Sequence, residues 1–361
     1  MKIITIIGAR PQFIKAAVVS RELLKKNNVQ EIIIHTGQHF DTNMSDVFFK
    51  EMEIPKPTYN LNINSLSHGA MTGQMIEKIE KVLLQEKPDW VLLYGDTNST
   101  LAGTVAAKKL HIKIAHVEAG LRMFEMENPE EINRIVTDRL SDILFCPSQI
   151  AINNLIKEGF NNFECQFVNC GDVMYDAALF YKNKAKKPSG YLPDKFGLCT
   201  MHRAENTDNL ENLNNIIQAL EEISKISPVL FPTHPRTKNK LKSIGYDLEK
   251  SNILFIDPVG YLEMVWLLEN CEIVFTDSGG VQKEAYFFEK YCIIFNSKTP
   301  WVELNYGGFN SLVGCKKEDI IESFNYFIRK PKSGFGLNLY GNGDASTKIV
   351  EHLLSFKNIA S

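Results

Sequence analysis

Several features that define common classes of protein are missing from this sequence. No apolar run approaches the roughly 20 residues that a membrane-spanning helix needs. The formal net charge is −3 and no basic stripe is present, so the charge pattern does not favour a nucleic-acid partner. No H-E-x-x-H or C-x-x-C spacing suggests a metal site, and no G-x-G-x-x-G follows a strand, which argues against a nicotinamide dinucleotide. We therefore expect no membrane, nucleic-acid, metal or redox-cofactor partner.

Cysteine is also sparse, and its spacing does not indicate disulfide pairs. The seven cysteines are scattered through the chain, and most lie in apolar, strand-like contexts such as Phe145-Cys146. We expect them to be small buried hydrophobic residues of a cytoplasmic protein, because thiols stay reduced in that compartment. The N-terminal apolar run reaches Gly8 too soon for a signal peptide and predicts a first buried strand.

Two α/β domains are expected from the length of 361 residues and from the order of the apolar segments. Strand and helix patterns alternate, restart after the polar stretch Lys182–Asp194, and predict parallel sheets covered by helices on both faces. We assign residues 1–172 to the first domain and 173–361 to the second, with a last helix, Ser346–Ser355, that could pack on either. The predicted strands are Ile3–Ile7, Glu31–His35, Trp90–Tyr94, Ile114–Val117, Ile143–Cys146, Phe196–Thr200, Val229–Pro232, Asn252–Ile256, Glu272–Thr276 and Tyr291–Phe295.

A glycine corner in the second domain suggests a nucleotide site. Ser278, Gly279 and Gly280 stand between an apolar strand and a helix, where backbone N–H groups at the helix N-terminus can bind a phosphate. Glu284 lies about one turn inside that helix, where a carboxylate can accept hydrogen bonds from ribose hydroxyls. The alternative is a glycine-rich turn followed by a Glu that the helix dipole stabilises.

Acidic residues follow two predicted strands of the first domain. Asp96 comes after Trp90–Tyr94, and Glu118 comes after the next strand. Consecutive parallel strands are often neighbours, so these carboxylates are expected to converge as general acid/base chemistry requires. Their structural alternatives are a helix N-cap for Asp96 and an ion pair with an arginine for Glu118.

A helix is predicted to start in the segment Asn128-Pro129-Glu130-Glu131. With Asn128 as the N-cap, Glu131 falls at the third helical position, where a carboxylate completes a capping box. The pattern therefore gives Glu131 a structural role and leaves Glu130 available for chemistry.

Basic side chains are predicted at three further strand ends. Arg10 and Lys15 flank the first glycine corner, where they either face a ligand or are solvated. His202 follows the first strand of the second domain and is either structural or able to stabilise a departing phosphate as a cation. His234, after the next strand, is a further candidate cation and nucleotide contact.

With these residues in view, the chain resembles the non-hydrolysing UDP-N-acetylglucosamine 2-epimerases over essentially its whole length. The resemblance rests on motifs in conserved order: GARPQFIK, TGQHF, GDTNST, HVEAGLR, NPEEINR, HRAEN, THPR and TDSGGVQKEA. It implies a GT-B fold, with two Rossmann-like doubly wound domains facing a deep cleft. It also implies interconversion of UDP-GlcNAc and UDP-ManNAc by elimination and re-addition of UDP, without a cofactor or catalytic metal, in a homodimer.

The resemblance also implies roles for individual residues. Catalytic roles fall on Asp96, Glu118, Glu130 and His202, and UDP contacts fall on Arg10, Lys15, Ser278, Gly279, Gly280 and Glu284. In some members of the family, the segment around Gln38-His39 binds a second, activating UDP-GlcNAc.

One segment departs from the family pattern. Pro300-Trp301-Val302-Glu303 stands where the family usually carries Glu-Arg-Pro-Glu, and it is similar to the branch acting on UDP-2,3-diacetamido-2,3-dideoxyglucuronate. The substituents at C3 and C6 of the sugar therefore remain open. A GT-B glycosyltransferase, a hydrolysing epimerase and a non-catalytic nucleotide-sugar binding module are the competing functions.

Overall fold

The computed structural model describes residues 1–38 and 53–356 of the chain. These residues group into two compact units, one made of Met1–Ala177 together with the stretch from Asn338 onward, the other of Ala178–Leu337. The chain therefore crosses between the units twice. We assigned the C-terminal stretch to the second domain and left its last helix free to pack on either, and the structure groups the stretch with the first unit.

The first unit is built on a seven-stranded parallel sheet in the order β3-β2-β1-β4-β5-β6-β7. Its strands are β1 (Lys2–Ile7), β2 (Gln30–His35), β3 (Tyr59–Asn60), β4 (Trp90–Tyr94), β5 (Lys113–Val117), β6 (Ile143–Cys146) and β7 (Gln166–Asn169). The order reverses between β1 and β4, and ligands of such sheets bind at the carboxyl ends of the strands beside that reversal.

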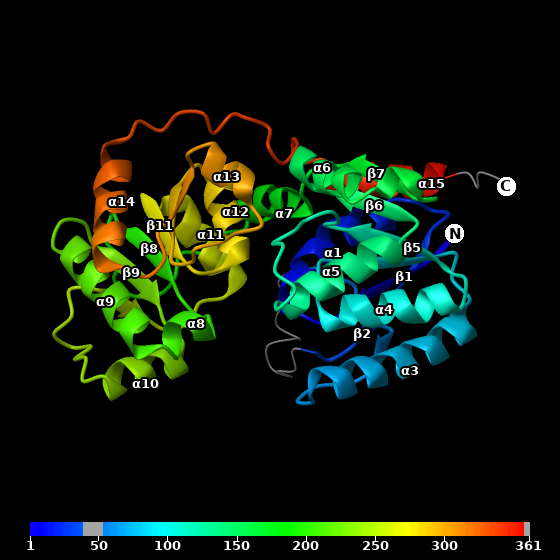
Figure 1. Ribbon diagram of the computed structural model, residues 1–361, viewed down its shortest axis with the longest axis horizontal. Coiled ribbons are helices and arrows are strands. Elements are labelled where there is room, and N and C mark those ends of the chain that lie inside the picture. The colour runs from blue at the N-terminus through cyan, green and yellow to red at the C-terminus, as the bar shows by residue number, and fades with distance from the viewer. Residues whose placement is uncertain (39–52, 357–361) are drawn as a thin grey trace. The chain divides into compact units, whose positions relative to one another are not determined.

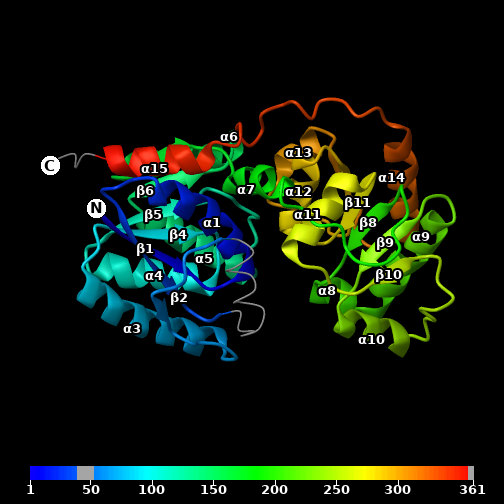
Figure 2. The same cartoon turned by 180° about the vertical axis from the view of Figure 1, so that it is seen from behind.

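Helices cover both faces of this sheet. On one face, α3 packs on α4 and α4 packs on α5, while α1 and α15 pack together on the other face (Figures 1 and 2). The helices of the unit are α1 (Arg10–Leu24), α3 (His68–Glu86), α4 (Asn98–Lys109), α5 (Pro129–Leu140), α6 (Gln149–Lys157), α7 (Val173–Lys182) and α15 (Ala345–Ser355), with a short 3₁₀ turn at Phe160–Asn162. Helix α7 carries the first crossing into the second unit.

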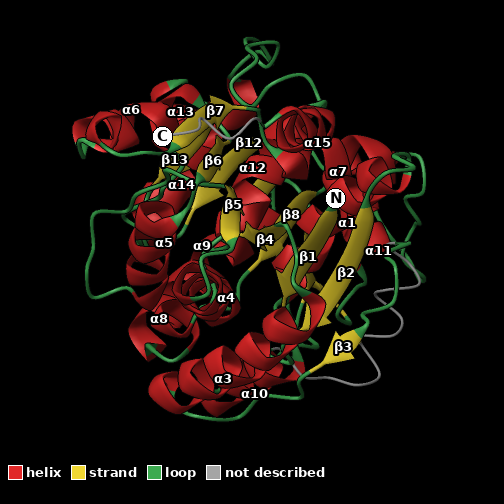
Figure 3. Ribbon diagram, turned by 90° about the vertical axis from the view of Figure 1, so that its right-hand side faces the viewer, coloured by secondary structure: helices red, strands yellow, loops and turns green. Residues whose placement is uncertain are grey.

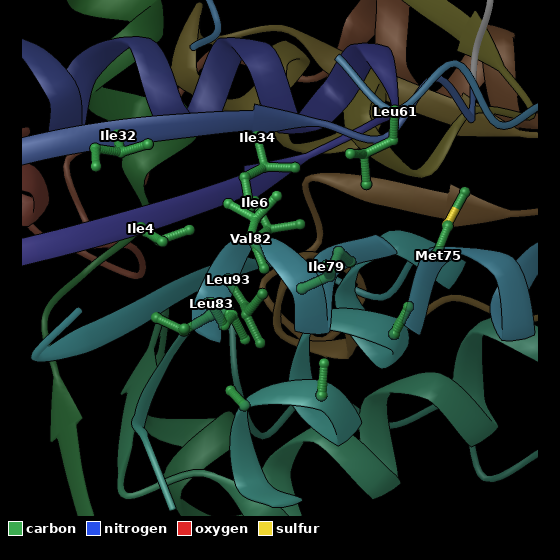
Figure 4. Close-up of a cluster of buried hydrophobic side chains, with 14 of the residues drawn as sticks. Ile4, Ile6, Ile32, Ile34, Leu61, Met75, Ile79, Val82, Leu83 and Leu93 are labelled. Atoms are coloured by element: carbon green, nitrogen blue, oxygen red, sulfur yellow. The ribbon is translucent and has the colours of Figure 1, made fainter. Parts of the chain in front are cut away.

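Alternation along the strands explains the core of the first unit. In β1, Ile4 and Ile6 point to the face covered by α3, whose Met75 and Ile79 recur at helical spacing and are fully buried. Figure 4 shows these side chains meeting Leu93 of β4 in one apolar cluster. A parallel sheet buried on both faces needs such continuous apolar strands, which is why the sequence predicted them.

The second unit repeats the design with six parallel strands in the order β10-β9-β8-β11-β12-β13. Its strands are β8 (Gly197–Thr200), β9 (Val229–Pro232), β10 (Leu254–Ile256), β11 (Ile273–Thr276), β12 (Tyr291–Ile294) and β13 (Asn310–Leu312). Its helices are α8 (Ala204–Thr207), α9 (Leu210–Ser224), α10 (Pro235–Ser243), α11 (Tyr261–Asn270), α12 (Gly279–Phe287), α13 (Val302–Tyr306) and α14 (Lys317–Arg329). The strand order reverses between β8 and β11, the strands that precede His202 and Ser278. Figure 3 shows the strands in yellow and the helices around them in red.

No helix in the described part of the chain is long and apolar enough to cross a membrane. All seven cysteines are free, and those at 146, 170, 199, 271 and 292 are buried, as the sequence predicted. Burial raises the pKa of their thiols, to about 12 for Cys271. These side chains therefore act as small apolar residues of the core.

Candidate active site

The corner after β1 is held tightly by its neighbours. A Cβ at Gly8 would lie 1.9 Å from Oγ1 of Thr36 and 2.3 Å from Oγ of Ser99, so only glycine fits there. The side-chain oxygen of Gln12 accepts hydrogen bonds from the N–H groups of Gly8 and Ala9, at 2.8 and 3.0 Å. This arrangement fixes the start of α1, whose first residue is the half-buried Arg10.

Lys15 lies one turn further along α1 and is buried. Its ammonium is 2.5 Å from Oε1 of Glu118, which is also buried. We had assigned Lys15 to the nucleotide, and the structure gives it a carboxylate partner. A buried carboxylate with a cation at this distance is stabilised in its ionised form.

The backbone at Glu118 adopts a left-handed conformation with φ of +72°. Such a conformation is uncommon for a residue with a side chain, and outliers of this kind are concentrated at functional sites. Gly95, after the neighbouring strand β4, also has a positive φ of +62°, and a Cβ there would lie 3.3 Å from Nζ of Lys15. The two strand ends therefore approach closely around this lysine.

Asp96 follows Gly95 and bonds Arg134 of α5. The guanidinium of Arg134 donates to Oδ2 of Asp96 and, at 2.5 Å, to the carboxylate of Glu131. Burial lowers the pKa of Arg134, but the carboxylates of Asp96, Glu131 and Glu118 raise it more, so its net shift is upward. Thr97, and not Asp96, caps α4 by accepting from the N–H of Thr100.

Glu130 and Glu131 have contrasting environments at the start of α5. Glu131 is fully buried and accepts from the N–H groups of Met123 and Phe124, at 2.9–3.0 Å. It therefore holds the loop before the helix and does not complete a capping box, so that detail of our prediction was wrong. Asn128 caps the helix by accepting from the N–H of Glu130, whose side chain is exposed to solvent.

The glycine corner in the second unit forms the start of α12, as predicted. Ser278 is its N-cap residue, and the helix runs from Gly279 with Glu284 in its second turn. Gly280 has no protein atom within 4 Å of an added Cβ, and neither glycine has a positive φ. The fold therefore does not require glycine at 280, and its missing side chain leaves room for a ligand.

Glu284 is buried beside the hydroxyl of Tyr261. Burial raises the pKa of Tyr261 well above its ordinary value, and the carboxylate of Glu284 raises it further. This places Glu284 in a polar environment inside the unit, close to the start of α12.

His202 is held through its backbone by Asp277, the residue before Ser278. The fully buried carboxylate of Asp277 accepts from the N–H groups of His202 and Arg203 and from the amide of Asn206, at 2.9–3.2 Å. Nδ1 of His202 lies 3.4 Å from the same carboxylate, while 63% of its side chain remains exposed. One buried acid thus joins the two strand ends at the sheet reversal.

His234 has a capping role in the structure. It is the N-cap of α10, and its Nδ1 accepts from the N–H of Arg236 at 3.2 Å. The neighbouring Arg236 bonds both carboxylate oxygens of Asp208, at 2.8 and 3.0 Å.

The segment that departs from the family pattern packs against α12. Oγ1 of Thr299 donates to Gln282 at 2.6 Å, and Nζ of the buried Lys283 lies 3.8 Å from the ring centroid of Trp301. A cation over the face of a Trp ring is an attractive contact, especially when it is desolvated. The loop is therefore tied to the helix that begins at the glycine corner.

Sequence reasoning missed three residues of this site: Arg134, Asp138 and Asp277. A signal for the first two was present, because Glu131, Arg134 and Asp138 recur at i, i+3 and i+7 on one face of α5. Within the described residues, no group of three or more His, Cys, Asp or Glu side chains is arranged to hold a metal ion. His39 of the TGQHF motif lies outside the described residues.

Two parallel α/β units, each with polar residues at its sheet reversal, define a Rossmann-type enzyme of two domains. The chain matches the UDP-N-acetylglucosamine 2-epimerase family over residues 21–354. It is 55% identical over 355 residues to the UDP-2,3-diacetamido-2,3-dideoxy-D-glucuronate 2-epimerase of Pseudomonas aeruginosa, covering 98% of this chain and 99% of the relative.

Solved structures give the same result. The UDP-GlcNAc 2-epimerase of Methanocaldococcus jannaschii, in complex with UDP-GlcNAc and UDP, superposes with a TM-score of 0.88 at 43% identity, over 98% of this chain and 99% of that one. The enzyme of Neisseria meningitidis bound to UDP-GlcNAc has a TM-score of 0.88 at 33% identity, over 99% and 100%. The chain therefore belongs to the UDP-N-acetylglucosamine 2-epimerase family. The predicted fold and the predicted class, a nucleotide-sugar 2-epimerase, are confirmed.

Proposed function

We propose that this chain inverts C2 of a UDP-2-acetamido sugar by eliminating UDP and adding it back. The convergence of carboxylates at the adjacent ends of β4 and β5 carries this proposal. Asp96 and Glu118 each have a cationic partner, Arg134 and Lys15, which holds the carboxylate in place for general acid/base chemistry. Glu130 is the third proposed acid.

The C2 proton of an acetamido sugar has no adjacent carbonyl and is very weakly acidic. Breaking the C1–O bond to UDP while a carboxylate takes the C2 proton forms a 2-acetamidoglucal and avoids a bare carbanion. Addition of UDP oxygen to C1, with a proton delivered to the other face of C2, completes the inversion. Every heavy atom of the substrate is retained, only the C2 hydrogen is exchanged, and no oxidant is needed.

The proposed nucleotide-binding residues lie mainly in the second unit. Backbone N–H groups at Ser278, Gly279 and Gly280 would hold the phosphates, with Glu284 accepting from the ribose. His202 would stabilise the negative charge on departing UDP. Arg10 and His234 are further proposed contacts, and Lys15 would act mainly through Glu118.

Proton NMR of the enzyme with a UDP-sugar in D₂O and no acceptor tests this function. We expect deuterium at C2 of both epimers with UDP still attached. Release of free sugar and UDP would instead indicate a hydrolysing epimerase. An unchanged substrate that reacts only when an acceptor is added would indicate a glycosyltransferase.

Two sugars are candidates. UDP-GlcNAc is the substrate that the resemblance of the sequence motifs implies. UDP-2,3-diacetamido-2,3-dideoxyglucuronate is favoured by the 55% identity to the enzyme named for it and by the Trp301 segment. We propose the second sugar as the better substrate, and steady-state kinetics on both decides the matter. Equal kcat/KM values for the two sugars would show that the Trp301 segment does not determine substrate specificity.

We also propose that the chain works as a cytoplasmic homodimer. The family resemblance supports the dimer, and the buried free thiols suit a reducing compartment. Light scattering on a sizing column should give a mass of about 82 kDa, twice the 41.0 kDa of the chain. A mass near that of one chain would rule the dimer out.

A further inference from the structure

A buried carboxylate on α5, that of Asp138, touches the chain on both sides of Glu118. Its Oδ1 lies 2.7 Å from Nδ1 of His116, two residues before Glu118. Its Oδ2 accepts from the N–H of Gly120, two residues after, at 3.1 Å. Asp138 and His116 are both fully buried. A single side chain thus holds both flanks of the residue with the left-handed backbone.

His116 extends this contact to the next strand end. Its Nε2 lies 2.7 Å from the carbonyl oxygen of Gly95, the residue before Asp96. Both ring nitrogens therefore face acceptors, a carbonyl and a carboxylate. The ring bridges Gly95 to Asp138.

Arg122 balances the charges of this cluster. Its guanidinium donates to Oδ2 of Asp138 at 2.7 Å and to both oxygens of Glu158 at 2.7 Å. Burial raises the pKa of Asp138, but His116 and Arg122 lower it more, so the carboxylate is ionised. His116, Arg122 and Asp138 thus form a buried network next to the acids, which Glu158 continues toward the surface, and none of them is one of the proposed catalytic groups.

We propose that Asp138 and His116 are positioning residues that hold the backbones of Asp96 and Glu118 in register for proton transfer. This inference rests on the proposed function. Proton transfer depends steeply on placement, because a misplacement of about 1 Å can cost about 10²-fold in rate. The network acts on the backbone at both strand ends, so its loss displaces two acids at once.

Asp138→Asn tests the proposal, with Asp142→Asn as its matched control. Asp142 is the counterpart at the other end of β5, where its carboxylate accepts from the N–H of Ile114 at 2.8 Å and pairs with Lys108. Both variants should lower the melting temperature. Only Asp138→Asn should lower kcat, by about 10-fold or more, with KM unchanged. Equal kcat values for the two variants, measured on folded protein, would overturn the proposal.

His116→Ala and the double variant His116→Ala/Asp138→Asn provide a second test. Residues that act through one network are non-additive, so the double variant should be no slower than the slower single variant. Additive losses in kcat would show that the two residues act separately and would contradict the inference.

Hydrogen exchange followed by mass spectrometry gives a readout that does not need turnover. In Asp138→Asn, amides in residues 117–122 should exchange about 10-fold faster than in the wild type, while Asp142→Asn leaves them unchanged. Unchanged exchange at 117–122 would overturn the positioning role even if no UDP-sugar is turned over. If the wild type shows no deuterium exchange at C2 in D₂O, but amides 117–122 exchange faster in Asp138→Asn, only the proposed function is rejected and the positioning role stands.

Discussion

The ammonium of Lys15 lies 2.5 Å from Oε1 of Glu118, and both side chains are buried. The contact joins the first turns of α1 to the end of β5, two segments about 100 residues apart in the chain. A lysine at the first sheet corner would be expected to bind a phosphate. Here it has a carboxylate partner inside the unit, which makes it part of the proposed acid/base group.

Lys15→Met should therefore lower kcat by about 10²-fold while leaving the dissociation constant for UDP nearly unchanged. The variant leaves Glu118 buried without this cation, so its melting temperature should also fall. Titration calorimetry with UDP and steady-state kinetics separate the two effects, and the exposed Lys109→Met is the control. A large loss of UDP affinity with an unchanged kcat would instead show that Lys15 binds UDP.

Asp96→Asn, Glu118→Gln and Glu130→Gln should each reduce kcat by about 10²-fold or more, which is usual for acid/base groups. Their UDP affinities should stay close to that of the wild type, because the proposed nucleotide-binding residues lie mainly in the other unit. Deuterium incorporation at C2 should fall in step with kcat. A variant that keeps wild-type exchange is not the proton carrier.

Glu131→Gln should cost more than the loss of a helix cap. The carboxylate is fully buried, bonds two backbone N–H groups and pairs with Arg134, so neutralising it should destabilise the protein by about 2 kcal/mol or more. Because Arg134 also bonds Asp96, kcat should fall as well, though less than in Asp96→Asn. Urea unfolding and kinetics check this, and an effect on stability below about 0.5 kcal/mol would contradict it.

Gly280→Ala should stabilise the protein and yet weaken UDP binding. Alanine in a helix is favoured over glycine by about 0.5–1 kcal/mol, and an added Cβ meets no protein atom within 4 Å. We expect UDP affinity to fall by about 10-fold, because the methyl group would occupy the space left for phosphate. Gly73→Ala in α3 is the control, since it should stabilise without affecting UDP. Unchanged UDP affinity in Gly280→Ala would argue against phosphate binding at the start of α12.

Glu31 provides a pH-dependent prediction. Burial raises its pKa above the ordinary 4.5, more than the hydrogen bonds from Thr5 and Ser20 lower it. A raised folded-state pKa means that its contribution to stability is present below the unfolded pKa and is lost as pH rises through the folded value. Glu31→Gln should therefore be more stable than the wild type at about pH 8, by about 1 kcal/mol.

That advantage should shrink as the pH is lowered toward the ordinary pKa of 4.5, where the wild-type carboxyl is protonated. Thermal melting across this range measures the difference. Glu77→Gln is a suitable control, because hydrogen bonding to Lys81 lowers the pKa of Glu77, so its difference should run the other way. An advantage of Glu31→Gln that grows in acid would contradict the assignment.

The strands of both sheets could be predicted because parallel strands buried on both faces read as continuous apolar runs. Every predicted strand is present, with ends within two residues of the prediction. The missed strands β3, β7 and β13 have two to four residues each, and all three stand at the edges of their sheets. Edge strands need fewer apolar residues, so their pattern is weak.

The sequence suggests functional positions near strand ends, but it does not identify polar partners that are distant in the chain. Glu118 directly follows β5, and Gly280 lies in the first turn of the helix after β11, so position alone suggests a function for each, and both stay predictions. Arg134 shares a helix face with Glu131 and Asp138, but its partner Asp96 and the partner of Asp277, His202, are distant in sequence. Only folding brings such partners together, so a single sequence does not pair them.

The return of the chain to the first unit has a consequence for synthesis. The carboxylate of Asp176 accepts from the N–H groups of Ala345 and Ser346, at 3.1 and 2.7 Å, and α15 packs on α1. All strands of the second unit lie within residues 178–337, so its sheet needs no segment that is synthesised later. The first unit, although its strands are made earlier, must wait for α15 to cover α1. A ribosome that stops near residue 337 would release one finished unit attached to one that lacks part of its surface.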